Sequence, residues 1–236
     1  MPEERLIIID DLVKIYPMGE TEIVAIDHVS LDLETGEFAG IVGPSGSGKT
    51  TLLNIVGTLD APTSGSVVVL GRRVETLDHR QAADLRNRKV GFIFQTFNLL
   101  PVYTVFENVE FPLLLLGVAA DERKRRVMQA LDWVGLADRA GSRPNQLSGG
   151  QCQRIAISRA VVKEPAVVLA DEPTANLDAE NSHNILRTMA RLNAELGTTF
   201  LFSTHDEKVI RYLRRKIVLD DGRVTADAVV EPEAGP

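Results

Sequence analysis

The chain has 236 residues, 44% of them hydrophobic, which is enough to bury a substantial core and predicts one domain with room for a small inserted subdomain. Its formal net charge of -7 excludes a protein whose main task is to neutralise nucleic-acid phosphates, because that task needs a basic surface. We therefore expect no nucleic-acid partner.

The sequence indicates a protein of a reducing compartment that does not itself cross a membrane. Its single cysteine, Cys152, rules out an intramolecular disulfide framework. The apolar run at residues 6–9 is too short for a signal peptide. The run at residues 111–120 is interrupted by Pro112 and Gly117 and falls short of the roughly 18 to 20 residues that span a bilayer. We expect a cytoplasmic protein without signal peptide or transmembrane segment, so any membrane role requires a partner.

Apolar and polar residues alternate in the two opening segments, residues 6–16 and 23–33, which predicts two antiparallel strands joined by a turn at residues 17–20. A short apolar strand is predicted at residues 38–42, and residues 49–56 carry apolar side chains at helical spacing. The chain therefore opens with an antiparallel β subdomain and then a strand, a loop and a helix.

The rest of the chain alternates between strands and helices. Further strands are predicted at residues 67–70, 90–94, 167–170, 199–202 and 217–219, and helices at 78–86, 121–134, 149–163 and 178–195. This alternation predicts an α/β fold with a mostly parallel core sheet covered on both faces. Residues 96–160 are predicted to form an inserted helical subdomain. We place a single domain at residues 1–224 and expect a disordered tail at residues 225–236.

The loop between the third strand and the first helix has the composition of a phosphate-binding P-loop. It comprises Gly43, Pro44, Ser45, Gly46, Ser47, Gly48, Lys49 and Thr50. Its glycines let successive backbone N–H groups point inward, Lys49 reaches the terminal phosphates, and the helix dipole favours the bound anion. We expect Thr50 to place its hydroxyl on magnesium and Thr51 to line the nucleotide site.

Two carboxylates, Asp171 and Glu172, follow the apolar strand at residues 167–170. The strand delivers them to its C-terminal edge, where open α/β sheets bind their ligands. Beside a P-loop, Asp171 would hold magnesium through water, and Glu172 would orient or deprotonate the attacking water. A solvated strand end capped by Pro173 is the alternative interpretation.

A second glycine-rich segment identifies the family that the chain resembles. It comprises Leu147, Ser148, Gly149, Gly150 and Gln151, with Gln153 and Arg154 shortly after. These residues resemble the signature motif of ABC-type ATPases, and further motifs of that family follow the expected order around Gln95, Asp178 and His205. The similarity extends from residue 6 to about residue 224, whereas a simple P-loop kinase or GTPase leaves the signature segment unexplained.

The resemblance implies a composite site. In this family the signature of one subunit closes over the phosphate held by the P-loop of another, so it implies a head-to-tail dimer with a second copy or with a homologous cassette. Residues 148–150 begin a helix whose free N–H groups and dipole would face a γ-phosphate. Gln95 would ligate magnesium and sense that phosphate. His205 would contact the phosphate and help to hold Glu172, and Asp178 would bridge the subunits.

The resemblance further implies ATP and Mg²⁺ as cofactors and hydrolysis of ATP to ADP and phosphate, with Glu172, His205 and Lys49 as catalytic residues. Tyr16 resembles the aromatic residue that stacks on adenine in this family, although a tyrosine that merely ends a strand beside a turn looks the same. Cys152 stands where many relatives carry glutamine, and we interpret it as packed and unreactive.

The segment that begins at Phe92 and ends at Pro101 is unusually apolar and aromatic for a loop, and its exposed part would form a groove for a partner helix. In transporters of this family that position receives a short cytoplasmic helix of an integral membrane permease. The resemblance therefore implies a permease contact here and a peripheral location at the cytoplasmic face of the membrane.

Finer details are similar to the lipoprotein-release and macrolide-export group (LolD and MacB types), although most of that group has glycine where Ala175 stands. Its members drive a membrane subunit mechanically, so the cargo never enters the ATPase and its sequence does not name it. The alternative function is a regulatory ATPase of the cell-division type, which signals through a membrane partner to a cell-wall hydrolase.

Overall fold

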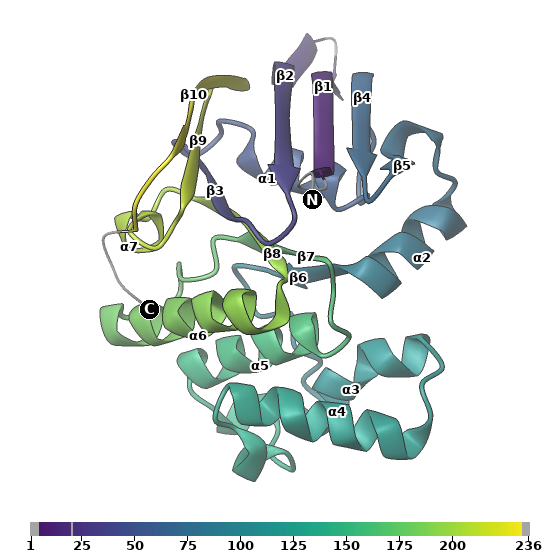
Figure 1. The fold of residues 1–236 in the computed structure, drawn as a ribbon, viewed down its shortest axis with the longest axis vertical. Helices are drawn as coiled ribbons and strands as arrows, with labels where there is room; N and C mark the ends of the chain where they lie inside the picture. The colour runs from purple at the N-terminus through teal and green to yellow at the C-terminus, as the bar shows by residue number, and fades with distance from the viewer. Residues whose placement is uncertain (1–4, 20, 233–236) are drawn as a thin grey trace.

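Two β-sheets organise the computed structural model, which describes residues 5–19 and 21–232 (Figure 1). The first sheet is antiparallel, with the order β2-β1-β4-β5. Its strands are β1 (Arg5–Met18), β2 (Thr21–Glu34), β4 (Ser64–Val69) and β5 (Arg72–Arg73). The β1–β2 hairpin confirms the predicted antiparallel opening, while Glu20 of the predicted turn lies outside the described residues.

The second sheet has six strands in the order β10-β9-β3-β8-β7-β6. They are β3 (Phe38–Val42), β6 (Val90–Ile93), β7 (Val167–Asp171), β8 (Thr199–Thr204), β9 (Arg215–Asp220) and β10 (Arg223–Val229). All neighbours pair in parallel except β10, which runs antiparallel to β9 at the edge. The predicted mostly parallel core sheet is confirmed.

Helices cover both faces of the second sheet. They are α1 (Lys49–Val56), α2 (His79–Lys89), α3 (Val105–Leu115), α4 (Ala120–Trp133), α5 (Gly149–Val161), α6 (Ala179–Leu196) and α7 (Glu207–Ile210), with short 3-10 turns η1 (Val74–Thr76), η2 (Ala137–Arg139) and η3 (Pro144–Gln146). Helices α3, α4 and α5 pack together below the sheet in Figure 1 and form the helical part. None of the helices in the described part of the chain is both long and apolar enough to span a membrane.

Alternating side chains on the central strand β8 divide the core into two clusters. Phe200 and Phe202 join the cluster that α3, α4, α5 and α6 cover, and Phe38 packs on Phe202 with 4.7 Å between ring centroids. Leu201 points the other way, into the cluster that α1 shares with the antiparallel sheet. Helices α1 and α5 therefore lie on opposite faces of the six-stranded sheet.

The structure differs from the disordered tail predicted at residues 225–236. Strand β10 continues to Val229, and the Val230 N–H donates to the Arg214 carbonyl at 2.9 Å. Most side chains of β10 are exposed, so this edge strand lacks the apolar alternation by which strands are recognised. The folded domain therefore extends beyond residue 224, while residues 233–236 lie outside the described part.

Candidate active site

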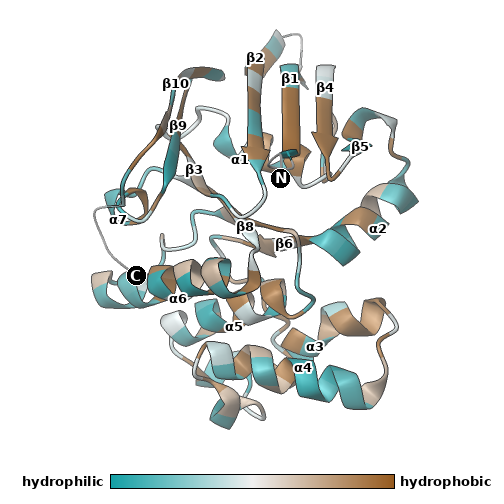
Figure 2. Ribbon diagram, in the orientation of Figure 1, coloured by the Kyte–Doolittle hydropathy of each residue, from teal (hydrophilic) through white to brown (hydrophobic). Residues whose placement is uncertain are grey.

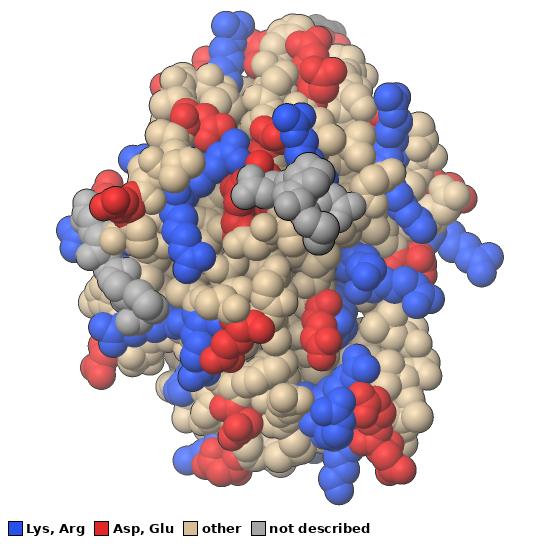
Figure 3. Space-filling model, in the orientation of Figure 1, with Lys and Arg blue, Asp and Glu red and all other residues tan. Residues whose placement is uncertain are grey.

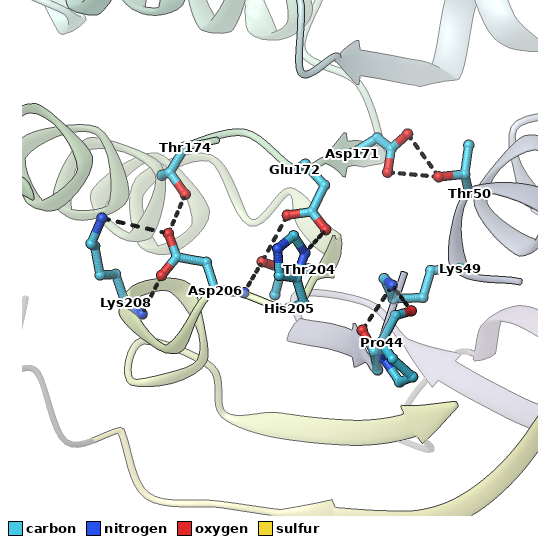
Figure 4. Close-up of polar contacts among 11 residues, drawn as sticks. Pro44, Lys49, Thr50, Asp171, Glu172, Thr174, Thr204, His205, Asp206 and Lys208 are labelled. Carbon is cyan, nitrogen blue, oxygen red and sulfur yellow. Dashed lines mark hydrogen bonds and ion pairs between the residues drawn. The ribbon is translucent and has the colours of Figure 1, made fainter. Parts of the chain in front are cut away.

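The P-loop joins β3 to α1 and folds around the Lys49 side chain. Gly46 and Gly48 adopt left-handed backbone conformations, with φ of +83° and +100°, and these conformations let the loop turn tightly. The buried Lys49 Nζ donates to the carbonyls of Gly43 at 2.8 Å and Pro44 at 2.7 Å (Figure 4). The loop thus holds an ammonium group at the position from which it could reach phosphate oxygens.

Gly48 and Gly46 allow a direct test of how tightly this loop is packed. A Cβ on Gly48 would lie 2.3 Å from the Ala25 carbonyl oxygen, whereas a Cβ on Gly46 would meet no atom within 4 Å. Both substitutions incur left-handed strain of roughly 1 to 2 kcal/mol, but only Gly48→Ala adds a backbone clash. We expect Gly48→Ala to lower Tm by about 3 °C or more beyond Gly46→Ala in thermal unfolding without nucleotide. Equal Tm values for the two variants would contradict this packing.

Thr50 and Asp171 come together from different elements, at the start of α1 and the end of β7. The Thr50 hydroxyl oxygen lies 3.1 Å from each carboxylate oxygen of Asp171. A hydroxyl and a carboxylate are oxygen ligands of the kind that Mg²⁺ prefers. The described residues contain no cluster of three or more His, Cys, Asp or Glu side chains suited to a metal. A cation here would therefore need further ligands, such as phosphate or water.

The Glu172 carboxylate is held from both sides. Its Oε1 lies 2.6 Å from His205 Nδ1, and the Thr204 hydroxyl donates to Oε2 at 3.3 Å. The Glu172 backbone is left-handed, with φ of 46°, and its N–H donates to the Ser203 carbonyl at 2.9 Å. Such strained conformations cluster at functional sites. The structure thus brings the predicted Glu172 and His205 together, and adds Thr204, which no sequence pattern indicated.

The loop that carries His205 is fixed by Asp206. The Asp206 carboxylate accepts the Lys208 N–H at 2.9 Å and the Thr174 hydroxyl at 3.2 Å, while its own N–H donates to the Thr204 hydroxyl at 3.0 Å (Figure 4). These bonds link the end of β8 to the segment after Glu172. Asp206 was missed as well, although its place beside His205 was the signal that could have found it.

Tyr16 lies close to the start of α1 and is anchored through its hydroxyl. The hydroxyl donates to Asp60 at 2.6 Å, and Lys14 Nζ donates to the same carboxylate at 2.7 Å while lying 4.8 Å from the ring centroid. Burial and the bond to Asp60 raise the pKa of Tyr16, so its hydroxyl remains a donor. Burial alone would raise the pKa of Asp60, but the bonds from Lys14 and Tyr16 lower it overall. No sequence pattern connects Asp60 with Tyr16.

Signature residues form the first turn of α5. The Ser148 hydroxyl accepts the Gln151 N–H at 3.3 Å, and the Gln151 side chain accepts the Ser148 N–H at 2.9 Å, which is a reciprocal capping box. A Cβ on Gly150 would lie 2.5 Å from the Asn181 side chain, whereas Gly149 has room for one. Leu147 packs against the core cluster under α5. Ser148 and Gln151 therefore cap the helix in this structure.

The signature and the P-loop do not meet within the chain. They belong to helices on opposite faces of the six-stranded sheet, and no hydrogen bond or ion pair joins residues 43–51 to residues 147–151 in the part that the structure describes. The P-loop and the signature segment therefore do not form a single site within this chain.

The structure also shows the hydrogen bonds or burial of three further residues singled out in the sequence, Asp178, Gln95 and Cys152. Asp178 begins α6 by accepting the Asn181 N–H at 2.8 Å, and this bond holds the pKa of the carboxyl below its usual range. The Gln95 carbonyl accepts the Asn176 side-chain amide at 2.9 Å, and the Gln95 residue itself is exposed. Cys152 is buried, and burial raises the pKa of its thiol, as expected of a packed and unreactive residue.

Comparison with known protein families decides which kind of P-loop protein this is. The family model described as ABC transporter matches residues 26–175, which include the P-loop, the signature and both carboxylates. The chain belongs to the ABC transporter ATP-binding family. It is an ABC-type ATPase, an enzyme that binds ATP and hydrolyses it to ADP and phosphate.

Relatives of this ABC ATPase are found among known proteins along nearly its whole length. An uncharacterised ABC transporter ATP-binding protein of Thermotoga maritima is 48% identical over 91% of both chains. The macrolide export ATP-binding/permease protein MacB of Burkholderia thailandensis is 46% identical over 95% of this chain, which spans only 34% of that relative.

Solved structures of an ABC cassette of Methanocaldococcus jannaschii have the same fold. This cassette is described as dimeric and, in one structure, as a post-hydrolysis state bound to ADP and Pi. The likeness has a TM-score of 0.87 at 42% identity and covers 97% of this chain and 99% of that one. The fold of this ABC ATPase is therefore that of its family, with an antiparallel β subdomain and a helical part.

Proposed function

We propose that the chain works as the motor of a membrane transporter, in a head-to-tail dimer whose ATP sites are shared between subunits. The observation that carries this proposal is the placement of the P-loop and the signature segment at helices on opposite faces of one sheet, with no hydrogen bond or ion pair between them. Two copies related by a twofold axis would place the signature of each opposite the P-loop of the other. The dimeric state described for the M. jannaschii cassette supports this arrangement.

Within such a site, each side chain would have a separate role in binding or hydrolysing ATP. Lys49, released from the Gly43 and Pro44 carbonyls, would donate to the terminal phosphates. Glu172 would accept a proton from the attacking water, since its carboxylate is held at a fixed position by His205 and Thr204. Thr50, Asp171 and Gln95 would hold Mg²⁺, which when bound would neutralise phosphate charge. Tyr16, anchored by Asp60, would stack on the adenine ring.

For the transported class, we propose export or lipoprotein release by mechanical coupling. The name of the MacB relatives combines an ATP-binding part with a permease, and this chain matches about a third of their length. An equivalent permease for this chain, whether a separate subunit or a fused region, would be driven by closure and opening of the dimer. Affinity capture from native membranes, followed by identification of the co-purifying integral protein, tests this role. A partner without membrane-spanning segments would contradict it.

We further propose that the permease docks in a groove between α2, β6, α3 and α5. The groove has a volume of about 720 Å³. Its apolar walls comprise Leu59, Phe92, Phe94, Leu100, Phe111 and Leu115. Figure 2 shows that α3, which supplies the last two, is largely hydrophobic. Phe97 and Leu99 do not line the groove: Leu99 packs on the helical core, and the Phe97 ring lies near Gly149. Substitutions at these two positions would therefore disturb the fold as well as docking.

Leu115 gives a cleaner test of docking. Its residue is 61% exposed and lines the groove, whereas its neighbour Leu114 is 45% exposed and does not. We expect Leu115→Asp to weaken binding to native membrane vesicles by about tenfold, because it places a charge against an apolar contact, while Leu114→Asp has little effect. ATP binding by both variants, measured with a fluorescent ATP analogue, should remain as in the wild type. Equal membrane binding of the two variants would remove the groove from the docking surface.

A further inference from the structure

The groove between α2 and α3 combines apolar walls with a cationic base. Four cationic side chains line it, Arg80, Arg86, Arg159 and Lys163, against the single carboxylate of Asp84 among the described residues. Figure 3 shows Lys and Arg side chains gathered where α2 lies, at the right of the view. The chain as a whole carries a net charge of -7, so this concentration of positive charge runs against the overall balance.

Three of these cations are held by neutral groups alone. Arg159 donates to the carbonyls of Asn98 at 2.6 Å and Phe97 at 2.9 Å. Lys163 Nζ donates to the Arg86 carbonyl at 2.8 Å, and the Arg86 guanidinium donates to Thr58. None of the three is paired with a carboxylate in the part of the chain that the structure describes.

Asp84, the one acidic residue of the groove, is already engaged. Its carboxylate lies 2.7 Å from the Arg88 guanidinium, on the exposed side of α2. It therefore does not neutralise the base of the groove. Because an ammonium has three donors and a guanidinium five, Lys163, Arg86 and Arg159 retain donors beyond their bonds to these neutral groups.

The three cations are also partly withdrawn from water. Burial lowers the pKa of Lys163 to about 8, and it lowers the pKa of Arg159 and Arg86 as well. A desolvated charge without an opposite charge nearby is unfavourable, and an incoming anion would relieve that cost. The walls, however, are aromatic and aliphatic, so an anion that bound alone would leave Phe111 and Leu115 exposed to water. The groove matches a ligand that is apolar and anionic at once.

We propose that the segment docked here is a short amphipathic helix of the membrane partner that places an Asp or Glu side chain on Arg86 and Lys163. Its apolar side chains would cover Leu100, Phe111 and Leu115, and its carboxylate would complete the ion pairs that this chain lacks. The inference rests on the proposed permease docking and adds the chemistry by which the partner is recognised. It predicts that docking depends on salt as well as on apolar contact, because part of the attraction is between charges.

The experiment measures sedimentation of the purified full chain with vesicles from membranes of its own source organism, stripped of peripheral proteins, across a range of salt concentrations. Lys163→Gln removes the charge and Lys163→Glu reverses it. Lys124→Glu, on the exposed face of α4 and outside the groove, makes the same charge change as a control. Thermal unfolding and ATP binding establish that each variant is folded.

We expect Lys163→Gln to weaken vesicle binding several-fold and to flatten its salt dependence, and Lys163→Glu to weaken it by about tenfold or more. Lys124→Glu should bind as the wild type does. Leu115→Asn, which leaves the charge unchanged, should weaken binding yet keep the salt dependence, which separates the apolar contribution from the charged one.

Two outcomes would overturn the inference while leaving the permease role standing. One is wild-type affinity and salt dependence in Lys163→Glu, which would show that no partner carboxylate meets this lysine. The other is equal binding of the wild type to protein-free liposomes made from the extracted lipids, which would assign the base of the groove to anionic lipid headgroups. Absence of saturable wild-type binding to the native vesicles would instead contradict the proposed permease role, and the inference with it.

Discussion

Replacement of Glu172 by Gln is expected to reduce ATP turnover by about a hundredfold or more while ATP binding is retained. The substitution keeps the shape of a side chain that is held by His205 and Thr204, but the amide cannot accept the proton of the attacking water. Since hydrolysis would no longer open the closed state, the ATP-bound dimer should accumulate. Phosphate release measures turnover, and size-exclusion chromatography with and without ATP measures the dimer.

Glu207→Gln provides the matched control. Glu207 is an exposed carboxylate at the start of α7, close to the same loop, so its replacement makes the same chemical change without touching the Glu172 carboxylate. This control should keep wild-type turnover. A Glu172→Gln protein that remains monomeric with ATP would count against the shared site, and one with normal turnover would remove Glu172 as the proton acceptor.

The second large effect is expected from mixing two inactive variants. Lys49→Ala disables the P-loop and leaves the signature intact, whereas Ser148→Arg disables the signature and leaves the P-loop intact. In a head-to-tail dimer, a mixed pair contains one site with both parts intact. An equal mixture should therefore recover up to about a quarter of wild-type ATPase activity, because half of randomly paired dimers are mixed and each has one working site of two.

A mixture of Lys49→Ala with Glu172→Gln is the control for this experiment. Both lesions lie on the P-loop side of the site, so every mixed dimer has two disabled sites and should show no recovery. Differently tagged subunits would establish that mixed dimers form in both mixtures. If mixed dimers form in the first mixture and activity does not return, the two segments do not complete each other's sites.

The site residues that could be predicted from the sequence belong to motifs of consecutive residues, whereas contacts between residues far apart in the chain could not be predicted in this way. The P-loop could be predicted because strand, glycines and lysine are consecutive, and Asp171 and Glu172 because an apolar strand precedes them. The contact between Glu172 and His205 required the family resemblance, since only the adjacency of β7 and β8 in the sheet brings the ends of these strands together.

Other features depend on contacts that no local pattern records. Asp60, in the loop between α1 and β4, accepts the Tyr16 hydroxyl, and nothing in the residues around Asp60 indicates an anchor for an aromatic ring. The sequence pattern predicted the groove within residues 92–101, and Phe92, Phe94 and Leu100 of that segment do line it. Leu99 instead packs on the helical core, and the walls that α3 supplies, Phe111 and Leu115, lie outside the predicted segment. Strand β10 was missed because its side chains face solvent.

Helix α5 has a consequence for how force could pass through the protein. Its first turn is capped by Ser148 of the signature, and Arg159 near its other end lines the groove. An α-helix of 13 residues is a stiff rod about 20 Å long. A movement of a docked partner that shifts α5 along its axis would displace Ser148 together with Arg159. The proposed docking groove and the proposed phosphate-binding signature therefore lie at opposite ends of one helix.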